Sequence, residues 1–197
     1  MTPHIETITI DPSTLCVPSC DMLRYSGCRE QSDERLCALS REVYEELVPL
    51  LTPMAVCTRV QVRFQGDVAD FGYFRTESRS LHKFLGGDCT AILFAATVGL
   101  GADRLIAKYS PILPSRAVIA DGCATAAIEC LCDHLCSSVF GVAPSARFSP
   151  GYGDLPLKIQ GDILSLVQAH LKIGLSMTDS MMLTPTKSVT AIVKAKD

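Results

Sequence analysis

One ten-residue segment, residues 147–156, concentrates chemically useful side chains in this 197-residue sequence. It supplies a guanidinium from Arg147, a phenol from Tyr152 and a carboxylate from Asp154, together with two glycines and two prolines. Glycine reaches backbone angles closed to other residues and proline restricts them, so the segment is predicted to be a shaped, ordered loop. The planar five-donor fork of Arg147 suits a carboxylate or a phosphate. The loop therefore indicates a small zwitterionic ligand rather than a long polymer.

Each of these side chains also has a purely structural interpretation. Arg147 can form a structural salt bridge, and Tyr152 can clamp the loop with its ring. Asp154 is expected to fix a turn through its own backbone. Gly151 is expected where the chain needs a positive φ or a close backbone approach.

The composition excludes several classes of protein. With 48% hydrophobic and 20% charged residues and a net charge of −3, the chain is an ordinary globular one. It has no run of Lys and Arg on one face, so we expect no nucleic-acid partner. No apolar stretch approaches the roughly 20 residues of a membrane-spanning helix, and the first residues do not resemble a signal peptide, so we expect a cytoplasmic protein without a membrane partner.

Ten cysteines are a high number for such a chain. In the cytoplasm they are expected to be reduced thiols rather than a disulfide framework. The sequence Cys130-x-Cys132-x-His134-x-Cys136 suggests a metal, but Cys130 and Cys132 would point about 200° apart on a helix. A zinc site normally takes ligands from a turn and a second element, so we predict no metal site here.

Hydrophobic periodicity predicts both strands and helices. Alternating or continuous apolar residues predict strands over 5–10, 58–64, 68–74, 89–98 and 188–194. Helical spacing predicts helices over 32–51, 80–85, 99–109, 115–140 and 159–174, the first beginning at Ser32. Hairpin signals mixed with unequal helices favour an α+β fold, with a central antiparallel or mixed twisted sheet and long helices packed on it. We expect one domain over 1–197, in which residues 1–30 form an N-terminal strand and extension.

Three segments, in their order and spacing, resemble the activation domain of cobalamin-dependent methionine synthase. They are the loop Arg147-x-x-Pro150-Gly151-Tyr152, the segment Pro185-x-x-Ser188-Val189, and the long helix that starts at Ala120-Asp121 and carries Glu129. The resemblance is strongest over residues 90–193, and residues 23–27 look like a segment of short, stand-alone relatives. It implies the activation-domain fold in a short stand-alone form.

The resemblance also implies a function in methionine biosynthesis. In this family, cobalamin that has fallen into the cob(II)alamin state receives an electron, typically from a flavodoxin-like donor, and is methylated by S-adenosylmethionine. The implied ligand-binding residues are Glu129, Arg147, Ser149, Pro150, Gly151 and Tyr152. Arg147 would pair with the methionine carboxylate, Tyr152 would stack on adenine or approach the sulfonium, and Glu129 would take the ammonium or the ribose hydroxyls. No catalytic acid or base is implied, so the chain would be an accessory part of the synthase.

The sequence also departs from the family pattern. The family loop usually continues Gly-Tyr-Pro-Ala-Cys-Pro, whereas here Gly153 and Asp154 follow Tyr152. The family uses an acidic residue near its N-terminus that has no evident counterpart in this sequence. No Asp-x-His-x-x-Gly motif is present, so the cobalamin would come from a separate methionine synthase subunit.

Two other functions stay open from the sequence. The run 89–98 followed by Gly99-x-Gly101 has the strand, glycine turn and helix of a nucleotide-binding fingerprint, which favours a Rossmann-type methyltransferase that uses S-adenosylmethionine. The cysteines leave room for a non-catalytic, cysteine-rich metal-binding scaffold.

Overall fold

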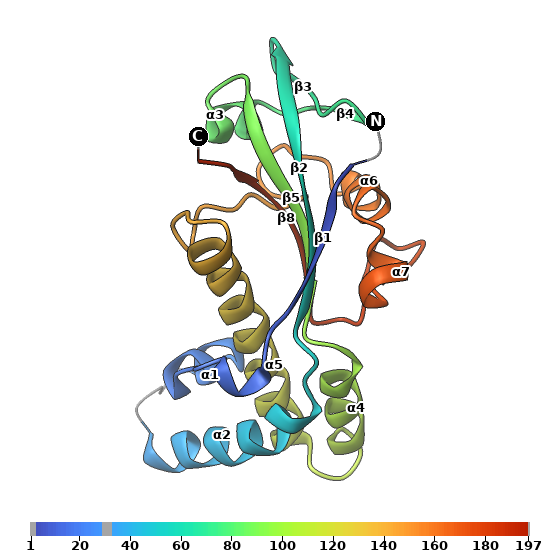
Figure 1. The fold of residues 1–197 in the computed structure, drawn as a ribbon. Helices are drawn as coiled ribbons and strands as arrows, with labels where there is room; N and C mark the ends of the chain where they lie inside the picture. The colour runs from blue at the N-terminus through green and yellow to red at the C-terminus, as the bar shows by residue number, and fades with distance from the viewer. Residues whose placement is uncertain (1–2, 29–32, 197) are drawn as a thin grey trace.

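A curled antiparallel sheet runs the length of the molecule in the computed structural model, which describes residues 3–28 and 33–196 (Figure 1). Its strands are β1 (Ile5–Thr9), β2 (Met54–Gln65), β3 (Val68–Asp70), β4 (Arg75–Glu77), β5 (Cys89–Thr97) and β8 (Ser188–Lys194). The order is β4-β3-β2-β5-β8, and β1 pairs with the first part of β2. A separate two-stranded ribbon joins β6 (Ser176–Met177) to β7 (Leu183–Thr184).

The helices divide between the two faces of this sheet (Figure 1). The long helix α5 (Pro114–His134) lies on one face, where α1 (Ser19–Tyr25), α2 (Glu34–Leu47) and α4 (Leu100–Tyr109) pack against it. The opposite face carries α6 (Ile159–Leu166) and α7 (Ala169–Ile173). The short helix α3 (Arg79–Leu85) follows β4. The predicted α+β class is therefore confirmed.

The central strands follow from their apolar patterns. In β5 every residue from Ala91 to Thr97 is buried, because helices cover both faces of the sheet. In β2 the predicted alternation holds from Arg59 onward, but the strand begins at Met54, four residues before the predicted start at 58. The preceding residues Ala55 to Thr58 are buried on both faces, so they show no period of two.

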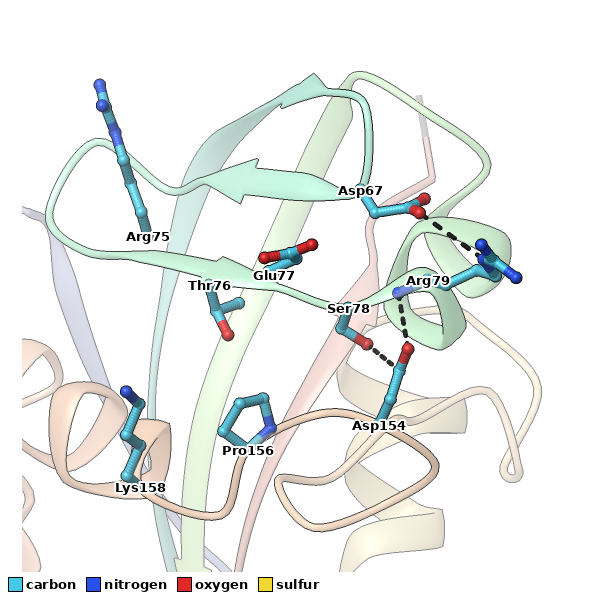
Figure 2. A pocket seen from close by; sticks show the side chains of 9 residues that line it. All are labelled: Asp67, Arg75, Thr76, Glu77, Ser78, Arg79, Asp154, Pro156 and Lys158. Atoms are coloured by element: carbon cyan, nitrogen blue, oxygen red, sulfur yellow. Dashed lines mark hydrogen bonds and ion pairs between the residues drawn. The ribbon is translucent and has the colours of Figure 1, made fainter.

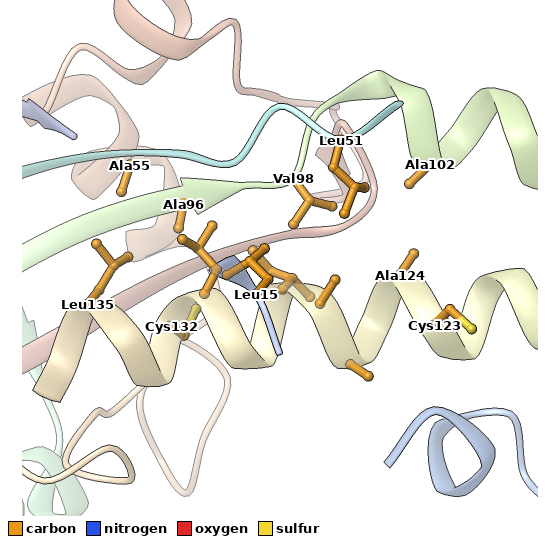
Figure 3. Packing of buried hydrophobic residues seen from close by; sticks show 14 of the residues in the cluster. Leu15, Leu51, Ala55, Ala96, Val98, Ala102, Cys123, Ala124, Cys132 and Leu135 are labelled. Carbon is orange, nitrogen blue, oxygen red and sulfur yellow. The ribbon is translucent and has the colours of Figure 1, made fainter. Parts of the chain in front are cut away.

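The main core lies between α5 and the sheet, and α5 contributes mostly small side chains to it. Figure 3 shows Cys132 of α5 and Leu135, the first residue after it, on the side that faces Ala55 and Ala96 of the sheet, and Ala124 of α5 opposite Ala102 of α4. Alanine and cysteine let the helix approach the sheet closely.

The tightest contact of α5 is with α1, at Gly122. An added Cβ there would lie 2.6 Å from both the Met22 oxygen and the Ser26 nitrogen, which are main-chain atoms. Glycine is therefore the residue that allows these two helices to touch.

Several predicted boundaries are corrected. The helix predicted over 115–140 ends as an α-helix at His134 and continues as a π-helical turn over Leu135–Val139. The helix predicted over 159–174 is two helices, broken at Gln168, whose φ of 53° is left-handed. Ser32 lies outside the described residues. The side chain of Asp33 caps α2 by accepting hydrogen bonds from the Arg35 and Leu36 amides.

The predicted strand–glycine–helix unit forms, since Gly99 has φ 85° and α4 follows β5 directly. However, β5 pairs antiparallel with both β2 and β8. A Rossmann fold has a mostly parallel sheet with its site at a switch in strand order. The topology therefore contradicts the Rossmann-type alternative. In the described part of the chain, no helix has both the length and the apolar character needed to cross a bilayer.

Candidate functional site

Arg147 bridges the loop that carries it to the polar side of α5. Its guanidinium donates to Glu129 Oε2 at 2.5 Å, to Asp133 Oδ1, and to the Pro144 carbonyl oxygen at 2.6 Å. The Arg147 side chain is only 15% exposed, whereas Glu129 and Asp133 are 36% and 49% exposed. The sequence-predicted residues Arg147 and Glu129 are thus brought together, with Arg147 as the buried partner.

These neighbours keep the Arg147 guanidinium protonated. Burial by itself would lower the pKa of Arg147, but the hydrogen bond to Asp133 and the charge of Glu129 outweigh it and raise the pKa. A guanidinium has five N–H donors, and the bonds to Asp133, Pro144 and Glu129 use three of them. A further hydrogen bond from Arg147 partly offsets the burial that raises the pKa of Cys136, so at most one donor remains for a ligand.

Beside this bridge lies a cavity of about 550 Å³ between α1, α5 and the segment before the loop. Its charged lining comprises Asp21, Arg24, Glu129, Asp133 and Arg147. We call it the α1–α5 cavity. Three carboxylates against two guanidinium groups give this lining a formal charge of −1. Such a lining suits a ligand with a net positive charge and both signs of charge.

The aromatic wall of the α1–α5 cavity comes from Tyr25. The Arg24 guanidinium stacks over its ring at 4.5 Å and pairs with Asp21 at 3.1 Å. Burial, with the nearby charge of Glu129, raises the pKa of Tyr25, so its hydroxyl stays protonated at neutral pH. The cavity therefore offers a phenol donor beside its carboxylates.

The same face of α5 also contacts the Pro-x-x-Ser-Val segment, through Lys187. Lys187 Nζ lies 2.8 Å from Asp121 Oδ1 and donates to Thr125 Oγ1 at 2.9 Å. Asp121, Thr125, Glu129 and Asp133 follow one another at intervals of four residues, which places them along one helix face. This polar stripe on α5 is thus paired with cations from two later segments, Lys187 and Arg147.

The loop 147–156 is ordered by anchors at both ends. Phe148 and Ile192 of β8 exchange main-chain hydrogen bonds of 2.8 and 2.9 Å. At the other end, Asp154 accepts from Ser78 Oγ at 2.5 Å and from the Arg79 amide at 2.9 Å. These bonds, that from Ser78 first, lower the pKa of Asp154. The expectation that Asp154 fixes a turn through its own backbone is wrong, because it caps α3 from a distant part of the chain.

Between these anchors, residues 149–153 form the outer bend of the loop. Gly151 has φ 89°, which confirms the need for glycine there, and its amide donates to the Leu155 oxygen at 2.9 Å. Pro150 is buried, and Ser149 is half-buried. Tyr152 is 59% exposed and its ring contacts Phe148 edge-on. None of these residues lines the α1–α5 cavity, and their roles in ligand binding stay predictions.

Cysteines gather on α5 without forming a ligand set among the described residues. Cys132 and Cys136 are buried, and Cys130 is half-buried. Burial raises the pKa of all three thiols. No group of three or more His, Cys, Asp or Glu side chains in residues 3–28 and 33–196 could hold a metal ion.

Several lining residues were missed from the sequence. Asp133 could have been found, because it continues the four-residue spacing of the stripe beyond Glu129. Asp21 and Arg24 belong to α1, a seven-residue helix that the periodicity did not show. Only packing of α1 on α5 at Gly122 brings them to the site.

Comparison with known proteins finds the fold but no close relative. No family model matches the chain, and no curated protein matches it. A crystal structure of the MetH reactivation domain bound to AdoHcy superposes with a TM-score of 0.73 over 98% of this chain and 78% of that one, at 15% sequence identity. This similarity confirms the predicted activation-domain-like fold: a curled antiparallel sheet with helices packed on it.

Proposed function

We propose that this protein binds S-adenosylmethionine and supports the reductive methylation of cobalamin carried by a separate methionine synthase subunit. The observation that carries the proposal is the α1–α5 cavity, a charged cavity on a fold whose solved example is described as bound to AdoHcy. AdoHcy is the product left when S-adenosylmethionine gives up its methyl group.

The charges of the α1–α5 cavity match this ligand. S-adenosylmethionine carries a carboxylate, an ammonium and a sulfonium, so its net charge is +1, opposite to the −1 of the lining. The remaining donor of Arg147 would hold one oxygen of the carboxylate, since a charge-assisted hydrogen bond orients a ligand as well as binding it. Glu129 and Asp21 would face the ammonium. Asp21 would thereby serve as the N-terminal acidic residue that the sequence alone did not reveal.

The outer bend of the loop would hold the rest of the ligand. Pro150, Gly151 and Tyr152 follow Arg147 by three to five residues, so a ligand that starts at the guanidinium can extend along them. Exposed aromatic rings offer a stacking face for adenine, and Tyr152 is the exposed ring of this loop. Ionic interactions would thus hold the carboxylate end of the ligand, and stacking on Tyr152 would hold its adenine base.

The chain's part in the reaction is to bind and orient. The nucleophile and methyl acceptor belong to the corrinoid of the partner, so this chain needs no general base. An electron donor of the flavodoxin type would have to reach that partner. The proposed role of this chain is therefore accessory to the synthase.

Titration calorimetry with S-adenosylmethionine tests the binding step. Arg147→Ala should weaken binding by about tenfold or more, the typical cost of losing a charge-assisted pair. The exposed arginine of α4 offers a matched control, and Arg104→Ala should leave binding unchanged. Thermal unfolding of each variant separates lost binding from lost structure. Absence of binding to the wild-type protein at millimolar ligand would refute the proposal.

Transfer of label tests the second step. The protein is mixed with a cob(II)alamin-loaded methionine synthase subunit, a reductant and methyl-labelled S-adenosylmethionine. Label should appear on the corrinoid only when this protein is present, and less of it with Arg147→Ala. Equal labelling without the protein would refute the accessory role while leaving binding intact.

A further inference from the structure

A second cavity, of about 600 Å³, lies beside the edge strand β4. Figure 2 shows β4 with β3 on one side and, on the other, the loop that carries Asp154, Pro156 and Lys158. We call this space the β4-edge cavity. It shares no lining residue with the α1–α5 cavity, so the ligand proposed above does not explain it.

The main chain of β4 presents to this cavity N–H and C=O groups that have no hydrogen-bond partner among the described residues. The Phe71 amide donates to the Phe74 oxygen, and the Ser78 amide donates to the Asp67 oxygen, which fixes the alternation of the ladder with β3. In an antiparallel ladder every second residue bonds to its neighbour strand, so here Thr76 bonds to β3. The N–H and C=O groups of the residues on either side, Arg75 and Glu77, therefore point away from β3. Among the described strands, β4 pairs only with β3.

Thr76 adds a buried hydroxyl that lacks a partner. Thr76 is 6% exposed, and its Oγ1 has no hydrogen-bond partner among the described residues. Figure 2 shows this hydroxyl pointing from β4 into the space above Pro156. A buried hydroxyl normally finds a partner, so an orphan one at a cavity wall indicates that a ligand group completes it.

Within the described part of the chain, the charges that line this cavity leave one cation and one carboxylate, Glu77, without an ion pair or a capping role. Asp154 is committed to capping α3, and Arg79 lies 3.6 Å from Asp67. Arg75 is 2.7 Å from Asp70.

The remaining cation is Lys158, which makes no ion pair with any described residue. Its side chain extends toward β4 from the loop side, toward the same space as the Thr76 hydroxyl (Figure 2). An acidic group placed there would meet a hydroxyl donor and an ammonium together.

We propose that the β4-edge cavity binds an extended peptide segment of a partner protein, which adds to the sheet as a strand next to β4. A residue of that segment opposite Thr76 points its side chain to the same face as Thr76. An aspartate or glutamate there accepts from the Thr76 hydroxyl and pairs with Lys158. The main chain of the segment bonds to the outward groups of Arg75 and Glu77.

A peptide fits these groups better than a small anion does. The outward groups of Arg75 and Glu77 comprise two donors and two acceptors at a spacing of two residues. An extended main chain supplies complementary donors and acceptors at that spacing, whereas phosphate or acetate supplies acceptors alone. Lys158, which has no ion pair among residues 3–28 and 33–196, matches one acidic side chain.

Nuclear magnetic resonance with a capped peptide, acetyl-Thr-Val-Glu-Val-Thr-amide, tests the proposal. The peptide should slow hydrogen exchange of the Arg75 and Glu77 amides, while the Thr76 amide, already bonded to β3, should change little. A peptide with glutamine in place of glutamate should bind about tenfold more weakly, because a charge-assisted bond is lost. N-methylation of the two peptide valines, which removes their main-chain donors, should abolish the slowing.

Protein variants locate the site. Lys158→Gln should weaken binding as much as the glutamine peptide does, whereas the exposed control Lys172→Gln on α7 should not. Thr76→Val, which removes the hydroxyl at equal volume, should keep the fold and weaken binding. The proposal is overturned if millimolar peptide leaves the Arg75 and Glu77 amides unchanged, or if the N-methylated peptide binds equally well. It is also overturned if acetate or phosphate alone gives the same protection, or if Lys158→Gln binds as the wild type does.

Discussion

Replacing Gly122 by alanine should destabilise the protein even though alanine is the better helix former. Within a helix, glycine to alanine gains about 1 kcal/mol of intrinsic propensity. Against this, the new Cβ would meet the Met22 oxygen and the Ser26 nitrogen at 2.6 Å, and both are main-chain atoms that cannot rotate away. Overpacking of this kind typically costs about 1–3 kcal/mol, and contact with two main-chain atoms belongs at the upper end. The clash therefore wins by about 2 kcal/mol.

A change of that size is measurable by thermal unfolding followed by circular dichroism. For a chain of this length, about 2 kcal/mol corresponds to a fall in Tm of about 4–8 °C. Gly161→Ala is the matched control, because the nearest atom to its added Cβ is the terminal methyl of Met177 at 3.1 Å, which can move. That control should be as stable as the wild type or more so. A Tm for Gly122→Ala equal to or above the wild-type value would refute the close contact of α1 with α5.

Gly122→Ala should also change the geometry of the α1–α5 cavity. Asp21 and Tyr25 lie on α1, so any shift of that helix changes the separation of their side chains from Glu129. If the proposed function is right, Gly122→Ala should bind S-adenosylmethionine more weakly, and Gly161→Ala should bind it normally. Unchanged affinity in a destabilised Gly122→Ala protein would show that α1 does not contribute to the ligand site.

Three further predictions follow from particular contacts. The pKa of Asp154 is lowered in the folded protein, so its stabilising effect is present above the ordinary carboxyl pKa of about 4 and lost as the pH falls below that value. When Tm is measured against pH, Asp154→Asn should therefore lose less Tm at acid pH than the wild type does. A double-mutant cycle of Lys187→Met with Asp121→Asn should give a coupling free energy of unfolding of about 0.5–1 kcal/mol, because the Lys187 side chain is only 15% exposed although that of Asp121 is 51% exposed. A coupling free energy of zero would contradict the contact. With a thiol reagent at pH 8, exposed Cys20 should react at once, whereas Cys132, buried and of raised pKa, should react only after unfolding; mass spectrometry of digested protein would identify each site.

Local patterns in the sequence were sufficient where a strand or helix is decided by its own residues. The buried run of β5 and the alternation in β2 predicted both strands, because one is covered on two faces and the other on one. The break between α6 and α7 could not be seen, because it occurs at Gln168 without a glycine or proline to mark it. The cap that Asp154 places on α3 joins residues 76 positions apart, and no local pattern encodes such a contact.

The loop differs from the pattern of the family that it resembles, and this difference has a structural reason. An added Cβ at Gly153 would lie 2.6 Å from Ser80 Oγ and 2.9 Å from Ser80 Cβ, so the loop approaches α3 too closely for a larger residue. Asp154 then caps that helix, and Leu155 is buried in the core beneath it. Glycine and aspartate at these positions therefore fasten the loop to α3. The substitutions that weaken the resemblance in sequence are those that hold the loop in place.

The polar face of α5 explains why three separated motifs indicated one fold. Asp121 and Thr125, the pair nearer the N-terminus of α5, bind Lys187 of the Pro-x-x-Ser-Val segment. Glu129 and Asp133, the pair nearer the C-terminus of α5, bind Arg147 at the start of loop 147–156. The loop motif and the Pro-x-x-Ser-Val motif thus each supply one cation to the helix that carries the third motif, and the helix fixes the separation of these two cations. The spacing of the motifs along the chain is therefore a consequence of a single helix face, which also forms a wall of the α1–α5 cavity.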